Sequence, residues 1–284
     1  MAFDLKNYLA ERKTRVEAEL YACLPVAGTR PAELSEAMRH AVISGGKRLR
    51  PILCLAAAEA AGGKPEDAMP AACAVELLHT YTLVHDDLPC MDNDTLRRGQ
   101  PTVWSKYGEA MAVLVGDALQ TLAFETLART TASPSSVAKL VSELAKAAGA
   151  SGVIAGQVED IQFADAPTHD IINYVFQHKT ADLFRAAVRL GGIAGHASDH
   201  DLQHLSIYGN NLGIAFQVID DILDAAESKS DDKPELSCLD IMSEEQARAY
   251  AQQTTATACA ALKNLPGDTK PLAALANELL SRVM

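Results

Sequence analysis

Apolar residues recur at steps of three and four along much of this 284-residue chain. One such run, from Met69 to Val84, predicts a helix over 66–86, and a second run predicts a long helix over about 200–225. The same periodicity, bounded by capping residues, glycines and prolines, predicts further helices over 3–24, 31–44, 52–61, 107–130, 135–149, 152–164 and 168–190.

The sequence shows no sign of a sheet, because no stretch alternates apolar and polar residues with the two-residue period of a strand. Alanine is abundant and aromatic residues make up only 5% of the chain, which favours closely packed helices. We find no repeat or linker that would divide the chain. The sequence therefore predicts a single all-α domain over residues 1–284, built as one large helical bundle.

Composition and charge exclude several classes of protein. With 48% hydrophobic and 22% charged residues the chain can bury a sizeable core. A formal net charge of −12 argues against nucleic-acid binding, and it allows anionic substrates only where positive charge is local or metal ions supply it. The N-terminus lacks a signal-peptide core and no segment reaches about 18 uninterrupted apolar residues, so we expect a cytoplasmic protein without a transmembrane segment. The six cysteines are scattered without metal-type spacing and are expected to be reduced.

Four aspartates fall within nine residues, 86–94, at the end of a predicted helix. Two carboxylates about 4 Å apart repel by roughly 4 kcal/mol at an effective dielectric near 20, so a cation is expected among them. Mg²⁺ prefers oxygen ligands and often bridges to phosphates, which the following Arg97 and Arg98 would also suit. Asp86 and Asp92 are six positions apart, close to two helical turns, and so near enough to share a metal ion. The alternative is a solvated acidic loop.

A second acidic cluster lies on the predicted helix over about 200–225. Asp220 and Asp224 are one turn apart, so their carboxylates project together, and Gln217 and Asp221 share that side. The other side is apolar and contains Leu212, Phe216, Ile219 and Leu223. Two acidic clusters on two helices of a bundle could face each other across a cavity and hold Mg²⁺ between them.

Four other polar clusters each have a structural alternative. The basic stretch 45–51 could simply complete a helix C-terminus. His79 lies seven residues before the first aspartate and could be a hydrogen-bonded core residue. The polar stretch 156–160 interrupts an apolar helix, and the lysine of 178–180 would normally extend to water.

Together these motifs make the chain resemble the trans-isoprenyl diphosphate synthases, and within them the bacterial farnesyl and geranylgeranyl diphosphate synthases. GGKRLRP, HDDLPCMDNDTLRRG, GQVED, HKT and FQVIDDILD occur in the family's order and at its spacing. The resemblance runs from about residue 35 to residue 225. Each motif alone is a weak signal, whereas the five together are specific. The resemblance implies a bundle around a central apolar cavity and, as is usual in the family, a homodimer.

The resemblance also implies a role for each motif. Several Mg²⁺ ions would be bound by Asp86, Asp87, Asp92, Asp220, Asp221 and Asp224. The allylic diphosphate would be held by Arg97, Lys179, Thr180 and Gln217. Isopentenyl diphosphate would be held by Lys47, Arg50, His79 and Arg98. Catalysis would depend on Asp86, Asp87, Asp92, Arg97, Lys179 and Asp220.

The implied reaction condenses isopentenyl diphosphate with an allylic diphosphate, either dimethylallyl or geranyl diphosphate. Metal ions and cationic side chains would stabilise the departing pyrophosphate, and an allylic carbocation would form in a dry apolar pocket. The double bond of isopentenyl diphosphate attacks that cation, and loss of a proton gives a chain five carbons longer. Pyrophosphate itself is the favoured base in the family, so no side chain is assigned that role.

Product length is expected to depend on the floor of the pocket. The resemblance points to Tyr81 and Thr82, five and four residues before the first aspartate. Tyr81 would lie about 7.5 Å from Asp86 along a helix axis. A bulky aromatic residue there resembles the farnesyl-forming pattern, so farnesyl diphosphate is the expected product and geranylgeranyl diphosphate the alternative.

The chain departs from the family pattern after Asp224. Family members usually carry a longer loop with a Gly-Lys pair whose lysine reaches the allylic diphosphate, whereas this loop is shorter, acidic and lacks that pair. Lys229 or Lys233 could substitute, without the flanking pattern. A non-catalytic partner subunit on the same scaffold is therefore an alternative, although it would have no chemical need for both aspartate motifs. A terpene cyclase is a third, which the Lys47, Arg50 and His79 set argues against.

Overall fold

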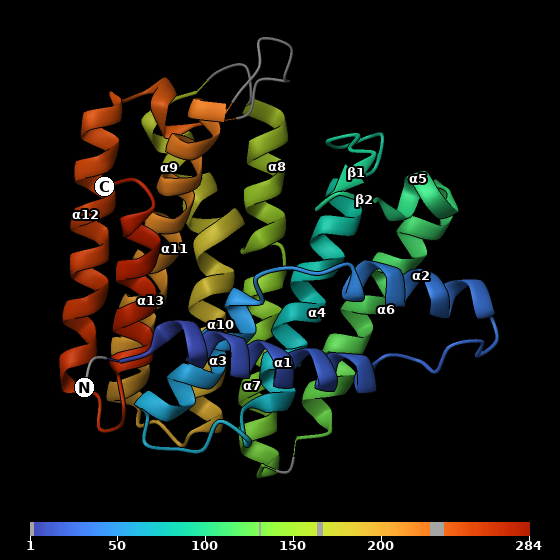
Figure 1. Ribbon diagram of the computed structural model, residues 1–284, viewed down its shortest axis with the longest axis horizontal. Helices are drawn as coiled ribbons and strands as arrows, with labels where there is room; N and C mark the ends of the chain where they lie inside the picture. Colours follow the sequence, from blue (N-terminus) through green and yellow to red (C-terminus); the bar gives the residue numbers. More distant parts are fainter. Residues whose placement is uncertain (1–2, 131, 164–166, 228–235) are drawn as a thin grey trace.

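The computed structural model describes residues 3–130, 132–163, 167–227 and 236–284, and almost all of its elements are helices (Figure 1). In chain order they are α1 (Leu5–Cys23), α2 (Ala32–Ile43), α3 (Leu49–Ala60), α4 (Met69–Asp86), α5 (Val103–Tyr107), α6 (Glu109–Ala128), α7 (Pro134–Ala148), α8 (Val153–Phe163), α9 (His169–Val175), the π-helix η1 (Phe176–Ala181), α10 (Asp182–Ala194), α11 (Asp199–Glu227), the 3-10 turn η2 (Cys238–Asp240), α12 (Glu244–Ala261), the 3-10 turn η3 (Leu262–Asn264) and α13 (Lys270–Ser281). The predicted all-α bundle is confirmed.

The core of the bundle forms around α4 and α10. Helix α4 packs against α3, α6 and α10, and α10 also packs against α3 and α11. Every residue of α3 from Ile52 to Ala58 is at most 1% exposed, and its small alanines let the neighbouring helices approach closely. Figure 1 shows α1 and α2 crossing the bundle, while α4, α6, α8, α11 and α12 run roughly parallel to one another. The apolar periodicity of the sequence thus becomes the packed interior.

The segment predicted as one helix over 168–190 is more complicated. It contains α9, one π-helical stretch and α10, which continues to Ala194. The expectation that Gly191 and Gly192 end the helix is wrong. Both are buried, and a Cβ on Gly191 would lie 1.9 Å from the carbonyl oxygen of Cys54 on α3, so this glycine permits close helix packing instead of capping.

A small hairpin was not expected. Strands β1 (Leu96–Arg97) and β2 (Gln100–Pro101) pair antiparallel directly after the first aspartate motif. The two residues between them, Arg98 and Gly99, have φ angles of 54° and 74°, as a tight hairpin turn requires. Strands of two residues are too short to show any alternation, so they could not be predicted from the sequence.

One described helix, α6, is long and apolar enough to span a membrane by length and composition alone. A helix in the interior of a bundle can meet the same criterion, and α6 packs along α4 with Val115, Leu119 and Ala123 fully buried. Its apolar character is therefore accounted for in part by core packing.

Candidate active site

The first aspartate motif begins where α4 ends. Asp86 is the last residue of the helix and Asp87 is its C-cap. The chain then doubles back, so that the amide of Asp92 donates to the carbonyl of Asp86 at 2.8 Å, and Asn93 adopts a φ of 61° in this turn. A loop therefore brings Asp86 and Asp92 together. The interpretation that they lie two turns apart along one helix is wrong, because the helix has already ended.

The carboxylates of this motif repel one another. Burial, with the Asp92 and Asp87 carboxylates, raises the pKa of Asp86 to about 7, against the opposing charges of Lys179 and Arg97. Burial also raises the pKa of Asp92 and of Asp87. A cluster with this electrostatic character favours a bound cation.

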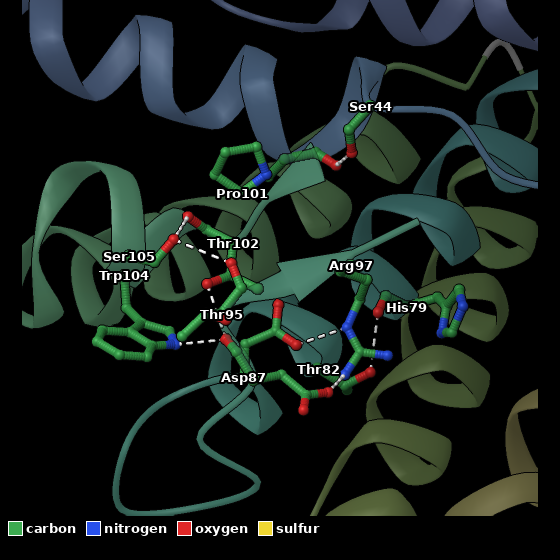
Figure 2. Close-up of polar contacts among 12 residues, drawn as sticks. Ser44, His79, Thr82, Asp87, Thr95, Arg97, Pro101, Thr102, Trp104 and Ser105 are labelled. Atoms are coloured by element: carbon green, nitrogen blue, oxygen red, sulfur yellow. Dashed lines mark hydrogen bonds and ion pairs between the residues drawn. The ribbon is translucent and has the colours of Figure 1, made fainter. Parts of the chain in front are cut away.

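Arg97 reaches the motif from the hairpin (Figure 2). Its Nε donates to Asp87 Oδ1 at 2.5 Å and its Nη2 donates to Asp94 Oδ2 at 2.9 Å. The indole of Trp104 and the hydroxyl of Thr102 both donate to the carbonyl of Asp94, at 2.7 and 2.9 Å, which ties the hairpin to the aspartate loop. The guanidinium is thus positioned among the aspartates before any ligand arrives.

Lys179 approaches the same carboxylates from the π-helix η1. Its Nζ donates to Asp160 Oδ2 of α8 at 2.5 Å. Burial lowers the pKa of Lys179, but Asp160, Asp86 and Asp92 outweigh that effect and the net shift is upward. Gly156 makes the contact possible, since a Cβ there would lie 2.2 Å from the backbone nitrogen of Lys179. Within the polar stretch 156–160, Gly156 therefore allows this close approach and Asp160 binds the lysine.

A buried aspartate anchors the π-helix. Asp182 is 2% exposed and pairs with His178 through Nδ1 at 2.8 Å and with Arg185 through Nη2 at 2.9 Å. Next to it, Thr180 donates to Gln217 Oε1 at 2.7 Å and so links η1 to α11. π-Helical turns often occur at functional sites, and this one presents Lys179 and Thr180 to the cavity described below.

The second aspartate motif divides into two parts. Asp221 is 7% exposed and accepts hydrogen bonds from the Cys238 amide at 2.7 Å and from Gln217 Nε2 at 2.9 Å. It therefore ties α11 to the segment at Ser237–Cys238. Asp220 instead pairs with Arg282 Nη1 near the C-terminus at 3.2 Å. Burial raises the pKa of Asp220, and the charge of the neighbouring, exposed Asp224 adds to this effect.

The predicted isopentenyl diphosphate residues line a second, basic pocket of about 460 Å³. Arg50 lies 3.3 Å from His79 (Nη1 to Nε2) and stacks over Phe184 with 4.6 Å between its Cζ and the ring centroid. Burial lowers the pKa of Arg50 to about 10. Burial and the surrounding arginines, Arg50 first, hold the pKa of His79 well below its usual value, so the ring is neutral. The other two predicted residues, Lys47 and Arg98, also line this pocket.

A larger cavity of about 610 Å³ adjoins this pocket, because Arg50 and His79 line both. Its polar end contains Asp86, Lys179 and Thr180, and its walls are formed by side chains of α4, α6 and α8. The apolar part of the lining includes Leu83 of α4, Met91 of the loop after α4, and Val153, Ile154, Val158 and Ile161 of α8. The cavity thus joins a charged end to an apolar channel.

Tyr81 and Thr82, the residues predicted to limit chain length, both line this cavity. Tyr81 is 5% exposed and its ring meets His85 edge-on at 5.8 Å. Among the described residues its hydroxyl has no hydrogen-bond partner of good geometry. Thr82 donates to the carbonyl of His79 at 2.8 Å (Figure 2), which fixes its rotamer.

The donor set is suited to Mg²⁺ only if a substrate shares the ion. In the part of the chain that the structure describes, no three His, Cys, Asp or Glu side chains are grouped closely enough to hold a metal alone. Mg²⁺ usually binds through one or two carboxylates, several waters and substrate phosphates. Asp86 and Asp92 provide such a partial set of oxygen ligands, and the mutual repulsion of the motif supports a cation there.

Comparison with known proteins agrees with this arrangement. The model of the family described as polyprenyl synthetase matches residues 31–269. The chain belongs to the polyprenyl synthetase family. It is a prenyl diphosphate synthase, a transferase of prenyl groups, as the sequence predicted.

Relatives within the family resemble the chain over nearly its whole length. Large subunit 1 of the heterodimeric geranylgeranyl pyrophosphate synthase of Arabidopsis thaliana is 42% identical over 301 residues, covering 99% of this chain and 80% of the relative. The crystal structure of a FPP/GFPP synthase from Zymomonas mobilis shares 36% identity with a TM-score of 0.90, covering 99% of this chain and 100% of that one. A geranyltransferase from Helicobacter pylori shares 32% identity with a TM-score of 0.85, covering 100% and 99%.

Several residues of this prenyl diphosphate synthase were missed by sequence reasoning. Asp182, Arg282 and Glu76 each pair with a side chain near the site, yet each is an isolated charge in the sequence. Glu76 and Asp182 could have been noticed only because each is a charged residue among the apolar residues of a predicted helix. The two proposed substitutes for the missing Gly-Lys lysine, Lys229 and Lys233, lie outside the described residues.

Proposed function

We propose that this enzyme catalyses the Mg²⁺-dependent condensation of isopentenyl diphosphate with dimethylallyl or geranyl diphosphate to give a trans short-chain prenyl diphosphate. The observation that carries the proposal is the pair of adjoining pockets, which share Arg50 and His79. One combines carboxylates and cations with an apolar channel, and the other is basic. This arrangement suits one diphosphate with a hydrocarbon chain beside a second diphosphate.

In the proposed reaction the allylic C–O bond breaks and pyrophosphate leaves with the bonding electrons. Arg97 and Lys179, which lie against Asp87 and Asp160, would neutralise the charge of the leaving group. Bound Mg²⁺, held by Asp86, Asp87, Asp92, Asp220 and Asp224 with support from Asp221, would supply further charge neutralisation. The isopentenyl double bond attacks the allylic carbon, a new C–C bond forms, and a proton is lost to the released pyrophosphate.

For the product we propose farnesyl diphosphate, on the basis of Tyr81. A buried aromatic ring on the cavity wall limits the space for a growing chain. Geranylgeranyl diphosphate is the second candidate, because relatives of the family with 42% and 40% identity carry geranylgeranyl pyrophosphate synthase in their names.

Replacing Tyr81 tests this proposal. Tyr81→Ala is expected to shift the product mixture toward chains longer by five carbons, measured by mass spectrometry of the dephosphorylated products. Tyr81→Phe keeps the ring and is the matched control, so its products should equal those of the wild type. An unchanged distribution in Tyr81→Ala would exclude Tyr81 as the floor of the channel.

We further propose that the enzyme is a cytoplasmic homodimer. Ile154, Val158 and Ile161 of α8, which also line the cavity, form an apolar stripe with exposed fractions of 44%, 45% and 53%. Val113 and Leu114 are exposed on α6, another helix that lines the cavity. A second copy of the chain covering these side chains would remove them from water. Because one relative is named as a heterodimer subunit, light scattering of the purified chain alone is the appropriate test.

The decisive experiment is a product assay with the purified full chain. The protein is incubated with Mg²⁺, isopentenyl diphosphate and each allylic starter in turn, and the prenyl products are identified. We expect chain elongation with dimethylallyl and geranyl diphosphate. Absence of turnover with every starter would contradict the proposal and favour a non-catalytic partner subunit.

A further inference from the structure

Arg48 lies between two of the cations proposed to bind isopentenyl diphosphate, yet its own side chain is occupied within the protein. Lys47 is exposed, whereas Arg48 is 3% exposed. Its Nη1 donates to Glu76 Oε1 at 2.9 Å and its Nη2 donates to the carbonyl of Val42 at 2.6 Å. Arg48 and Glu76 therefore form an ion pair whose two side chains are 2% and 3% exposed.

The backbone at Arg48 is also unusual. Its φ of 53° lies in the left-handed region, which a residue with a side chain adopts only where its surroundings enforce it. Helix α3 begins at the next residue. Two residues earlier, Gly46 packs under Arg98, which donates to the carbonyl of Gly45, and a Cβ on Gly46 would lie 2.5 Å from the guanidinium. The loop is therefore held in place by Arg98 and by the buried pair.

The ion pair connects two elements of the basic pocket. Glu76 lies on α4 one turn before His79, and Arg48 lies between Lys47 and Arg50. These five residues and Arg98 line the same pocket. A shift of the loop relative to α4 would therefore change the distance between Lys47 and His79 directly.

We propose that the Arg48–Glu76 ion pair is a positioning element that fixes the loop bearing Lys47 and Arg50 in register with His79 on α4. The inference rests on the proposed function, because it assigns this pocket to isopentenyl diphosphate. Buried ion pairs are often no more stabilising than well-packed apolar residues, so stability alone is a poor reason to bury two charges here. A defined loop geometry is a better one, since the pocket must present several cations to one diphosphate.

The test uses Glu76→Gln, which keeps the size of the side chain and removes its charge, together with Arg48→Lys, which keeps the charge and removes the forked donor. Both variants are expected to raise KM for isopentenyl diphosphate by about tenfold. This value is taken from metal sites, where losing a residue that orients a ligand lowers affinity by about 10- to 100-fold. KM for the allylic substrate and kcat should remain within about twofold, because Lys179 and the aspartates are not touched.

The matched control is Glu143→Gln. Glu143 forms a partly buried, bidentate pair with Arg189 at 2.6 and 2.7 Å, and neither residue lines the two pockets. This control is expected to lower Tm without changing either KM. Should a single variant fail to fold, the double variant Arg48→Gln/Glu76→Gln replaces the ion pair with two neutral amides and should show the same selective rise.

The proposal is overturned if Glu76→Gln lowers Tm but leaves KM for isopentenyl diphosphate unchanged, or if both KM values rise equally. Calorimetric titration with isopentenyl diphosphate separates this result from the proposed function. Wild-type protein that binds the ligand but forms no prenyl product would contradict the proposed function, while a tenfold weaker Kd in Glu76→Gln would still support the ion pair's role. Wild-type protein that does not bind the ligand would overturn both.

Discussion

The two pockets hold their cations in opposite ways. On the allylic side, Arg97 and Lys179 are each paired with an aspartate, and these partners raise the pKa of both cations despite burial. On the isopentenyl side, burial lowers the pKa of Arg50 to about 10 and also lowers the pKa of Arg98, against the opposing charge of Glu76. The aspartate motif beside the larger cavity has more carboxylates than cations, whereas the basic pocket is lined by four cations and one carboxylate.

From this difference we predict that the two proposed substrates depend unequally on metal ions. A diphosphate that approaches the first aspartate motif meets like charge, so it needs an additional cation to bind. A diphosphate in the basic pocket meets arginines and a lysine directly. The comparison therefore predicts that Mg²⁺ controls one side of the reaction and not the other.

Removal of the metal should have the largest effect. With excess EDTA, turnover is expected to fall by roughly 10³-fold or more, because charge stabilisation of the leaving group is lost. Calorimetry should show weaker binding of dimethylallyl diphosphate and nearly unchanged binding of isopentenyl diphosphate. Equal loss of both affinities would contradict a metal requirement confined to the allylic side, and restoration of turnover by added Mg²⁺ is the control.

A matched pair of lysine variants tests whether the two pockets have separate roles. Lys179→Gln removes a cation beside the aspartates and should lower kcat by about 10²-fold. Lys47→Gln removes one from the basic pocket and should raise KM for isopentenyl diphosphate by about tenfold, the value of one charge-assisted hydrogen bond, with little change in kcat. Steady-state kinetics with each substrate varied in turn distinguishes the two patterns. The same pattern from both variants would contradict separate roles for the pockets.

Gly156→Ala tests the packing that supports the allylic side. The new methyl group would lie 2.2 Å from the backbone of Lys179, so α8 and η1 must separate. Overpacking of this kind is expected to destabilise the protein by about 1–3 kcal/mol in urea unfolding. Affinity for isopentenyl diphosphate should be unchanged, since that pocket does not involve α8. A fully stable variant with normal kcat would show that the helices can separate at no cost.

The smallest expected effect concerns His79 on the isopentenyl side. Burial and the charges of Arg50, Arg98, Arg48 and Arg97 hold its pKa well below 6.5 in the folded state. Below about pH 6.5 the unfolded chain binds a proton at His79 and the folded chain does not, so the free energy of unfolding decreases as pH falls. Between pH 7 and pH 5, His79→Gln should lose less stability than the wild type. Parallel curves for the two proteins would contradict a neutral, buried His79.

Much of the fold could be predicted because helical periodicity is a local property. The helix expected over 66–86 is Met69–Asp86, and the one expected over about 200–225 is Asp199–Glu227. The prediction failed where the outcome depends on a distant partner. Gly191 and Gly192 lie inside a helix because α3 and α11 pack against them, and no local pattern distinguishes such glycines from helix caps.

For the site, the types of functional side chain and the family could be predicted from the sequence. Each motif of the site is a continuous stretch of sequence, so the spacing of its residues is visible without a structure. This holds for the two aspartate motifs, the basic stretch and the HKT motif. Tertiary structure alone decided what each side chain does within them. Asp221 is bound to the Cys238 amide while Asp220 pairs with Arg282, and Arg48 is buried on Glu76 while Lys47 is exposed. Adjacent residues differ in burial and in hydrogen-bond partner because a different distant element packs against each side chain.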